Sequence, residues 1–216
     1  QFLNKKYYNW LVQTKLVKKN LSKYLYVKEN MISVHPFFTL PEKKIINEKL
    51  NVFFYPADGT RQKNHIFLFN VWEKFFLKYN YSPTLFVTID EKKYPLLIQS
   101  ILFYKKKGLN IVNLGHLNYN EIIKYYVSSK YIVFPSLTES FGLPLLEACI
   151  YNCKIIAADL EYVHEIIQPS ITFNVNSEDD LVEIIYNTIK NDNFLNHPFI
   201  KIKNNMKELI KLINEN

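Results

Sequence analysis

Short apolar runs alternate with longer amphipathic stretches along most of the chain. From residue 51 onward, each largely apolar run of four to seven residues is followed by a stretch whose apolar positions recur at helical spacing. The runs predict strands over 51–57, 84–89, 109–115, 131–136, 154–159 and 171–174. The stretches between them predict helices over 63–80, 93–107, 118–129, 161–167 and 177–192, and one more helix that starts near Pro144.

A strand followed by a helix, repeated in this way, is typical of one fold class. Crossover helices join parallel strands, and a parallel sheet is covered by helices on both faces. We therefore expect an α/β fold, in which residues 41–193 form a Rossmann-like parallel sheet of about six strands with helices on both faces.

The two ends of the chain depart from this alternation. The first 40 residues predict a strand, a helix and a strand over 10–14, 14–25 and 31–37. We expect residues 1–40 to be the end of a preceding domain and the connection to the sheet, and residues 194–216 to form a basic C-terminal helix. The chain begins at Gln1 without an initiator Met or a leader peptide, so we expect it to be part of a longer protein.

The chain carries a net charge of +7, and Arg61 is the single arginine among its 27 basic residues. Lysine, asparagine, isoleucine and tyrosine are abundant and glycine is scarce, a bias typical of AT-rich genomes. That bias accounts for the charge; a selected nucleic-acid or membrane surface is the alternative. No apolar run approaches the roughly 18 residues that a membrane span needs.

Cys149 and Cys153 are too few for a disulfide framework. They lie four residues apart, on one side of a predicted helix and its exit, where a small apolar side chain packs well. No His or further Cys lies nearby to complete a metal site. We expect two reduced core thiols, no metal ion and a cytoplasmic location.

Three of the four glycines, Gly59, Gly115 and Gly142, each follow a predicted strand. Ligands of open α/β sheets bind outside the carboxyl ends of the strands. Glycine there lets the backbone adopt a positive φ or come close to a ligand. The glycines therefore indicate a ligand site at this edge, with ordinary strand-to-helix turns as the alternative.

The stretch FPSLTESFGLPLLEA leads into a helix that has no evident capping side chain. Pro144 suits the first helical position, which places Leu143 near the N-cap, and leucine cannot accept a hydrogen bond from the first-turn amides. A phosphate can accept those hydrogen bonds, and Gly142 would let it approach the main chain. Ser140 or Glu139 folding back as an irregular cap is the competing interpretation.

Two glutamates flank this helix start. Glu139 lies in the loop before it, and Glu147 lies about one turn inside the helix. Carboxylates so placed suit hydrogen bonds from sugar hydroxyls, such as the vicinal diol of a ribose. They also suit acid–base catalysis or a metal site, although no third acidic residue stands beside them in the sequence.

Cationic side chains follow the first strand of the predicted sheet. Arg61 and Lys63 lie beside Gly59, and His65 comes next. Cations in this loop would face a phosphate bound at the sheet edge. A solvated loop is the alternative, and it applies more to Lys63, in a lysine-rich chain, than to the single arginine.

The stretch PSLTESFGLPLLEA resembles the Glu–seven residues–Glu motif of glycosyltransferase family 4, whose members are retaining enzymes with the GT-B fold. The segments YPADGTRQKNH, LGHLNYNEIIKYYVSSKYIVFPS, CKIIAADLEYVHEII and FNVNSEDDLVEII occur in the order of that family, and the similarity covers about residues 10–190. Enzymes of this family have an N-terminal acceptor domain and a C-terminal sugar-nucleotide domain. The chain resembles the C-terminal, donor-binding half.

The resemblance implies roles for the residues of the motif. Glu147 would bind the ribose hydroxyls, and Glu139 would bind the hydroxyls of the transferred sugar. The backbone amides of Phe141, Gly142 and Leu143 would meet the diphosphate and the sugar, which agrees with a helix start that lacks a capping side chain.

The resemblance also assigns residues outside the motif. Lys63 matches the basic residue that neutralises the diphosphate, and the loop with Gly115 and Leu117 would hold the base. Many members have an arginine six residues before this lysine, where this chain has Ala57. Arg61 is the candidate substitute; otherwise one positive charge is absent.

The activity implied is retaining transfer of a hexose from a nucleoside-diphosphate sugar to a glycan or lipid-linked acceptor in polysaccharide biosynthesis. Lys63 and the helix N-terminus would stabilise the leaving diphosphate and Glu139 would act beside the sugar, without a cofactor or divalent metal. The acceptor site and a histidine that many relatives use would lie in the absent half. We therefore expect the chain alone to bind nucleotide but to transfer little or no sugar, and the whole protein to contact the inner face of a membrane peripherally.

Two other functions fit the same sequence features. A GT-B nucleotide-sugar epimerase or a phosphorylase would use the same pocket. A non-catalytic basic Rossmann module would bind nucleic acid or an anionic membrane. The chain lacks a basic helix interleaved with stacking aromatics, so we expect no nucleic-acid partner.

Overall fold

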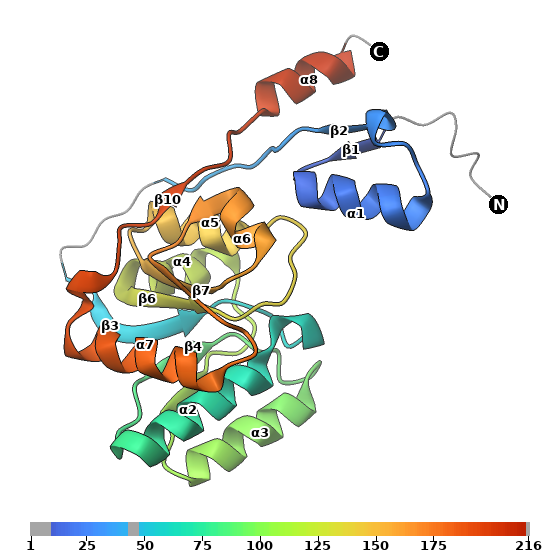
Figure 1. Ribbon diagram of the computed structural model, residues 1–216. Helices are drawn as coiled ribbons and strands as arrows, with labels where there is room; N and C mark the ends of the chain where they lie inside the picture. Colours follow the sequence, from blue (N-terminus) through green and yellow to red (C-terminus); the bar gives the residue numbers. More distant parts are fainter. Residues whose placement is uncertain (1–9, 43–47, 215–216) are drawn as a thin grey trace.

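The computed structural model describes residues 10–42 and 48–214. Its centre is a six-stranded parallel sheet with the order β5-β4-β3-β6-β7-β9 (Figure 1). The strands are β3 (Leu50–Tyr55), β4 (Leu85–Val87), β5 (Ile111–Asn113), β6 (Ser129–Phe134), β7 (Lys154–Ala158) and β9 (Ile171–Phe173). The predicted α/β class and Rossmann-like parallel sheet are confirmed.

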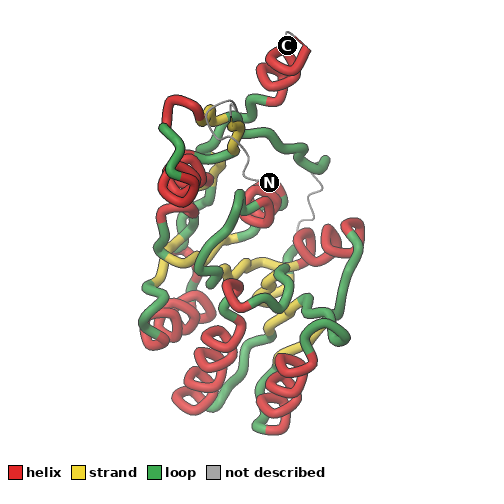
Figure 2. Tube along the Cα trace, turned by 90° about the vertical axis from the view of Figure 1, so that its right-hand side faces the viewer, coloured by secondary structure: helices red, strands yellow, loops and turns green. Residues whose placement is uncertain are grey.

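Helices cover both faces of this sheet, as the alternating pattern predicts. Three lie on one face: α2 (His65–Tyr79), α3 (Pro95–Lys106) and α7 (Glu178–Lys190). Three lie on the other: α4 (Tyr119–Ser128), α5 (Leu143–Ile150) and α6 (Glu161–Ile166). Seen from the side, the strands run between the two helical layers (Figure 2).

The strand order reverses between β3 and β6. The chain passes from β3 to β4 and β5 in one direction, and then from β6 to β7 and β9 in the other. In open α/β sheets the crevice outside the carboxyl ends of the strands at such a reversal is where ligands bind. The loops after β3 and β6 both lie there, and they carry Lys63 and Glu139.

Aromatic rings fill much of the core next to this reversal. The Phe53 and Tyr131 rings stack with centroids 4.9 Å apart, and Trp72 meets Phe53 edge-on at 5.4 Å. All three are buried, and the Trp72 indole N–H donates to the carbonyl of Pro83 at 2.8 Å. Aromatic residues in this chain therefore largely report core packing rather than a stacking surface.

The first described residues form a separate small unit beside the main sheet. Strands β1 (Trp10–Val12) and β2 (Ile32–Val34) pair in parallel, with α1 (Lys15–Leu25) between them in sequence. These elements match the strand, helix and strand predicted there. The proposed domain boundary at residue 40 stays a prediction, and residues 1–9 of the proposed preceding domain lie outside the described residues.

The C-terminal prediction is wrong in part. Helix α8 covers only Met206–Asn214. A 3-10 turn over Asp192–Phe194 and the strand β10 (Phe199–Ile200) precede it, and β10 pairs antiparallel with β8 (Ile167–Gln168). Pro198 lacks an amide hydrogen and interrupts helical bonding, so the pairing with β8 prevails over the local helical preference.

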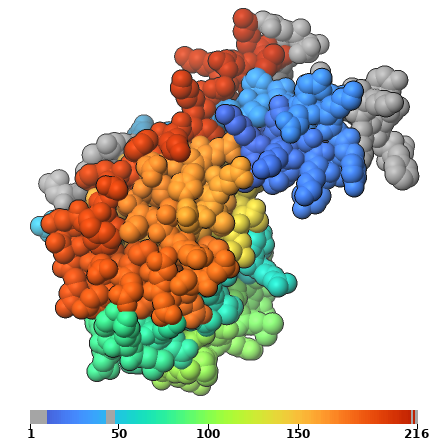
Figure 3. All heavy atoms as spheres, viewed as in Figure 1, coloured from blue at the N-terminus to red at the C-terminus, as the bar shows by residue number. Residues whose placement is uncertain are grey.

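The two ends of the described chain meet. The amide of Asn205 donates to the Pro36 carbonyl at 2.7 Å, and the Asn204 side chain donates to the Phe38 carbonyl at 2.7 Å. Figure 3 shows the blue N-terminal residues and the red C-terminal residues side by side at one end of the molecule. None of the described helices combines the length and the apolar character that a bilayer crossing demands.

Candidate functional site

Two loops meet at the carboxyl edge of the sheet, where the strand order reverses. One follows β3 and contains the 3-10 turn Arg61–Lys63, and the other follows β6 and leads into α5. The Leu137 amide donates to the Gln62 carbonyl at 2.8 Å, and the Ser136 hydroxyl donates to the same carbonyl at 3.4 Å. The fold thus holds together two loops that are about seventy residues apart in the sequence.

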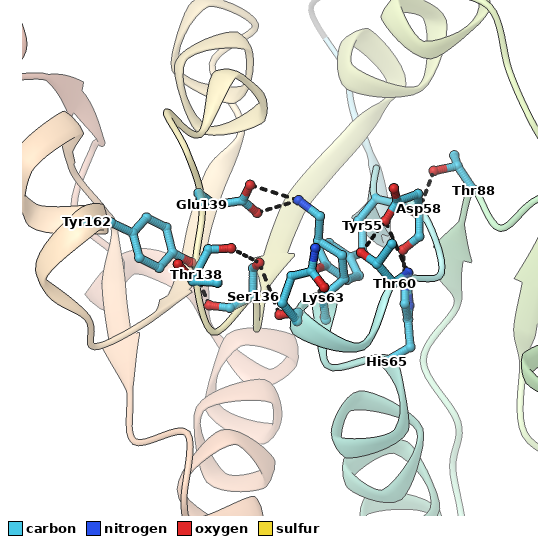
Figure 4. Close-up of polar contacts among 12 residues, drawn as sticks. Tyr55, Asp58, Thr60, Lys63, His65, Thr88, Ser136, Thr138, Glu139 and Tyr162 are labelled. Carbon is cyan, nitrogen blue, oxygen red and sulfur yellow. Dashed lines mark hydrogen bonds and ion pairs between the residues drawn. The ribbon is translucent and has the colours of Figure 1, made fainter. Parts of the chain in front are cut away.

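Lys63 and Glu139 form an ion pair across these loops (Figure 4). The ammonium donates to both carboxylate oxygens, at 2.7 Å to Oε1 and 2.8 Å to Oε2. The two side chains are only 17% and 9% exposed, so water screens their attraction less than that of a surface pair. The predicted phosphate-binding and sugar-binding residues are therefore in direct contact.

Two buried tyrosines fix the loops that carry this pair. The Tyr55 hydroxyl donates to the Lys63 carbonyl at 2.8 Å, and the Tyr162 hydroxyl donates to the Ser136 carbonyl at 2.6 Å. Burial, and next the charge of Glu139, raises the pKa of Tyr55 and of Tyr162, so both hydroxyls stay protonated and able to donate. Sequence reasoning missed both, because a tyrosine in an apolar segment predicts only core packing.

His65 is not the cation that the sequence suggests. Its ring is 3% exposed, and Nε2 lies 2.6 Å from the Asp58 carbonyl oxygen. Burial lowers the pKa of His65 from its usual 6.5 to about 4, against the opposing effect of Asp58. The imidazole is therefore neutral at physiological pH, and it holds the loop before Lys63 instead of facing a phosphate.

This neutral histidine makes stability depend on pH. Because the folded pKa is lower than the unfolded one, the unfolded chain binds the proton first as the pH falls. The free energy of unfolding should drop by roughly 3 kcal/mol from this group between about pH 6.5 and pH 4. Urea unfolding at about pH 7 and pH 4.5 should show most of that loss in the wild type and much less in His65→Gln. His164→Gln is the control, because the His164 side chain is 40% exposed; equal losses in His65→Gln and wild type would contradict the assignment.

An open cavity of about 530 Å³, called the main cavity below, lies over the ion pair. Residues of α1 form one wall and the two loops form the other; the lining comprises Val17, Asn20, Leu21, Tyr24, Asp58, Gln62, Lys63, Thr138, Glu139 and Ser140. Within the described parts of the chain, Lys63 is the one cationic side chain in this lining. The sequence did not predict that α1 lines this cavity, because no motif connects α1 to the two loops.

Glu165 attaches α1 to the main sheet domain. Its carboxylate accepts hydrogen bonds from the backbone amides of Lys15 and Leu16, the latter at 3.1 Å, and Thr14 caps the Val17 amide at 3.1 Å. The first amides of α1 are thereby satisfied, and a carboxylate at a helix N-terminus is stabilising. A residue about 150 positions away thus sets the far wall of the cavity.

Arg61 lies on a different surface from Lys63. It is exposed and lines a separate cavity of about 240 Å³ together with Gly59, Thr60 and Leu97. The hypothesis that Arg61 faces the same phosphate as Lys63 finds no support in this placement. Ala57, at the position where the family resemblance implies an arginine, is buried, and Lys63 is the single cation in the lining of the main cavity among the described residues.

Gly59 has a packing role that the sequence did not reveal. A Cβ at this position would lie 2.4 Å from Cγ of Tyr94. Such a distance is far below van der Waals contact, so the loop needs glycine there because the ring of Tyr94 approaches its backbone. The expected contact of Gly59 with a ligand stays a prediction.

Helix α5 starts one residue earlier than predicted. Gly142 is the N-cap, with φ 78° and ψ 40°, and Leu143 and Pro144 are the first two helical residues. No side chain caps this helix, which excludes the irregular cap by Ser140 or Glu139. Among the described residues we find no acceptor for the amides of Phe141, Gly142 and Leu143. The expected unsatisfied helix start is therefore present, with Ser140 beside it on the cavity wall.

Glu147 lies farther along α5 and is absent from the lining of the main cavity. Its carboxylate is half-buried, and this burial raises its pKa in spite of a contact with Tyr126. Burial, and next the charge of Glu147, raises the pKa of Tyr119 at the start of α4. Glu147 thus lies near Tyr119, the first residue of α4 after the loop with Gly115 and Leu117, and it does not line the cavity of the Lys63–Glu139 pair.

Gly115 has open space around it. Its φ is +73°, and a Cβ there would meet no atom within 4 Å. Leu117, two residues later, is half-buried. The positive φ explains glycine at this turn, and the free space leaves the main chain of the loop accessible.

The described residues contain no group of three or more His, Cys, Asp and Glu side chains that could hold a metal ion. Cys149 and Cys153 are both free thiols. Burial raises the pKa of Cys149 to about 12 and also raises that of Cys153, so neither forms a reactive thiolate at neutral pH.

A parallel sheet with helices on both faces and converging loops at its strand reversal defines a Rossmann-like α/β domain. The sequence matches the family described as glycosyl transferases group 1 over residues 37–209, which is most of the chain. The chain belongs to this family.

Two curated relatives come from bacterial polysaccharide synthesis, as their names state. The O-antigen chain mannosyltransferase RfbU of Salmonella typhimurium is 26% identical over 136 residues, which cover 62% of this chain and 36% of that protein. The capsular polysaccharide biosynthesis glycosyltransferase CapH of Staphylococcus aureus is 28% identical over 167 residues, 73% of this chain and 44% of that protein. The chain thus spans less than half the length of either relative.

Solved structures of glycosyltransferases share the fold. A glycosyltransferase from Rickettsia africae superposes with a TM-score of 0.71 at 17% identity, covering 89% of this chain and 59% of that one. Anabaena HepE, solved in complex with UDP and glucose, superposes with a TM-score of 0.69 at 14% identity, covering 86% of this chain and 54% of that one. The sheet and its helices are those of a GT-B glycosyltransferase domain.

Proposed function

We propose that this chain is the donor-binding part of a retaining glycosyltransferase. The whole protein would transfer a hexose from a nucleoside-diphosphate sugar to a glycan or lipid-linked acceptor. Membership of the glycosyl transferases group 1 family and the relatives in polysaccharide biosynthesis support transfer of a sugar. The complex of HepE with UDP and glucose supports a sugar nucleotide as the donor.

One observation carries this proposal. The start of α5 lies beside the main cavity; among the described residues its amides at Phe141, Gly142 and Leu143 have no acceptor, and Lys63 is the one cation of the lining. Amides at a helix N-terminus and an ammonium group are together a suitable receptor for a diphosphate. Gly142 adopts the positive φ that this helix start requires.

The other residues divide the donor between them. Glu139 would accept hydrogen bonds from the transferred sugar in the main cavity. Glu147 and the loop of Gly115 and Leu117 would hold the ribose and base, because Glu147 lies near Tyr119, which directly follows that loop. Glu139 and Glu147 would then bind opposite ends of the donor, and the diphosphate would lie between them.

The proposed chemistry uses no metal ion. Negative charge accumulates on the diphosphate as the bond to the sugar breaks, and Lys63 with the α5 amides would stabilise it. Retention follows when the acceptor hydroxyl attacks from the face that the diphosphate leaves, and a departing phosphate oxygen takes the proton of that hydroxyl. The acceptor would bind on the side of α1.

Thermal shift with UDP, GDP and ADP tests donor binding. We expect one of the three to stabilise the wild-type chain, and Glu147→Ala to weaken that nucleotide roughly tenfold, because it loses hydrogen bonds to the ribose worth about 1.5 kcal/mol. Glu183→Ala is the matched control, since Glu183 is 50% exposed and lies away from the cavity.

Two results would contradict the proposal. One is that none of the three nucleotides stabilises the chain. The other is salt-sensitive binding of DNA without any nucleotide effect, which would instead support the basic-module alternative.

A further inference from the structure

Glu139 has one polar partner among the described residues, and that partner is the ammonium of Lys63. A carboxylate accepts hydrogen bonds and donates none. With only 9% of this side chain exposed, water replaces a lost partner poorly. Moving Lys63 away from the pair therefore leaves an under-solvated charge unless another donor arrives.

A diphosphate in the main cavity would likewise depend on Lys63 for its cationic partner. This lysine is the one cation in the lining of the main cavity within the described residues. Besides Lys63 and Glu139, the described lining includes the acid Asp58, whose carboxylate accepts hydrogen bonds from the amide and hydroxyl of Thr60 at 3.1 and 2.6 Å. A diphosphate in this cavity thus competes with Glu139 for a single ammonium.

The competition is confined to the side chains. The Lys63 carbonyl is held by the Tyr55 hydroxyl, and the Gln62 carbonyl is held by the Leu137 amide. Figure 4 shows the Lys63 ammonium and the Glu139 carboxylate facing each other from these two loops. Because hydrogen bonds hold the main chain on both sides, we expect a ligand to turn the ammonium while the carboxylate stays in place.

We propose that Glu139 makes this site select a sugar nucleotide over the bare nucleoside diphosphate, an inference that rests on the proposed function. When Lys63 turns to the diphosphate of a sugar nucleotide, the sugar hydroxyls take its place as donors to Glu139. A bare diphosphate brings no such donors, so Glu139 keeps its hold on Lys63 and weakens binding. The ion pair then favours donor binding and the release of the diphosphate product.

The variant Glu139→Gln removes the charge and keeps the shape. We expect it to bind the nucleotide chosen from UDP, GDP and ADP roughly three- to tenfold more tightly than the wild type does, because Lys63 is released. Its affinity for the matching UDP-glucose, GDP-mannose or ADP-glucose should stay equal or fall. Isothermal titration calorimetry on the full chain measures both Kd values, and their ratio is the readout.

Two further variants make the test specific. Glu139→Asp keeps the charge and lengthens the ion pair, so the ratio should lie between those of the wild type and Glu139→Gln. Glu183→Gln breaks the Lys78–Glu183 pair, in which both side chains are 50% exposed, and should leave the ratio unchanged.

The outcomes separate this inference from the proposed function. If Glu139→Gln weakens both ligands by the same factor, or binds the bare diphosphate no more tightly than the wild type, the inference is overturned while the donor site remains. If the wild-type chain binds none of the six probes, the proposed function is overturned and the inference with it.

Discussion

Lys63→Met should raise the Kd for the preferred nucleoside diphosphate roughly 10- to 100-fold. Lys63 is the one cation of the main cavity lining among the described residues, and a hydrogen bond to a charged group contributes about 1.5–3 kcal/mol. Methionine preserves the apolar stem, so the loss reports the ammonium rather than the packing. Isothermal titration calorimetry with the nucleotide identified by thermal shift measures the change.

The same substitution should also lower the free energy of unfolding, by about 1–3 kcal/mol, because Glu139 keeps its charge without a donor. Lys74→Met is the matched control. Lys74 pairs with Asp179 at 2.7 Å, yet the two side chains are 41% and 71% exposed, so we expect at most about 1 kcal/mol and no change in Kd. Wild-type affinity in Lys63→Met would rule out the role given to this lysine.

Gly142→Val should combine a large loss of stability with a loss of nucleotide binding. The φ of +78° is strained for a β-branched residue, and a Cβ there would already lie 3.0 Å from Cδ1 of Ile166. Strain and overpacking together suggest about 2–4 kcal/mol of lost stability. To relieve that strain, the backbone at the start of α5 must move. The amides of Phe141, Gly142 and Leu143 would then no longer point together at the diphosphate. Urea unfolding and calorimetry measure the two effects.

Gly108→Val separates these two effects. Gly108 has a φ of +95°, and a Cβ there would lie 3.2 Å from Cζ of Phe76, so this variant should lose stability to a similar extent. It follows α3 at the opposite edge of the sheet, and the folded protein should bind nucleotide as the wild type does. If both glycine variants retain binding, the α5 amides do not form the receptor.

Much of the fold could be predicted from the chain alone, because short apolar runs and helical hydrophobic patterns report local burial. The six strands and the helices between them are confirmed within a few residues. The prediction was wrong where distant pairing outweighs local preference. In the segment before α8, the pairing of β10 with β8 produces extended chain where a helix was expected.

The candidate site was predictable in its parts and not in its arrangement. Glycine at position 142 and the absence of a capping side chain are local properties, and the structure shows the same unsatisfied amides. The neutral state of His65 and the separate surface of Arg61 depend on burial and on the path of the loop. A sequence motif lists charged residues without showing which of them share a cavity.

The sequence by itself determined the α/β alternation, the membership of a glycosyltransferase family and the loops that carry the site, because these depend on local pattern and spacing. Only the tertiary structure decided that Lys63 pairs with Glu139, that Tyr55 and Tyr162 hold their loops, and that α1 forms one wall of the cavity. These contacts join residues far apart in the chain, and they arise from the reversal of strand order that brings two loops to one point.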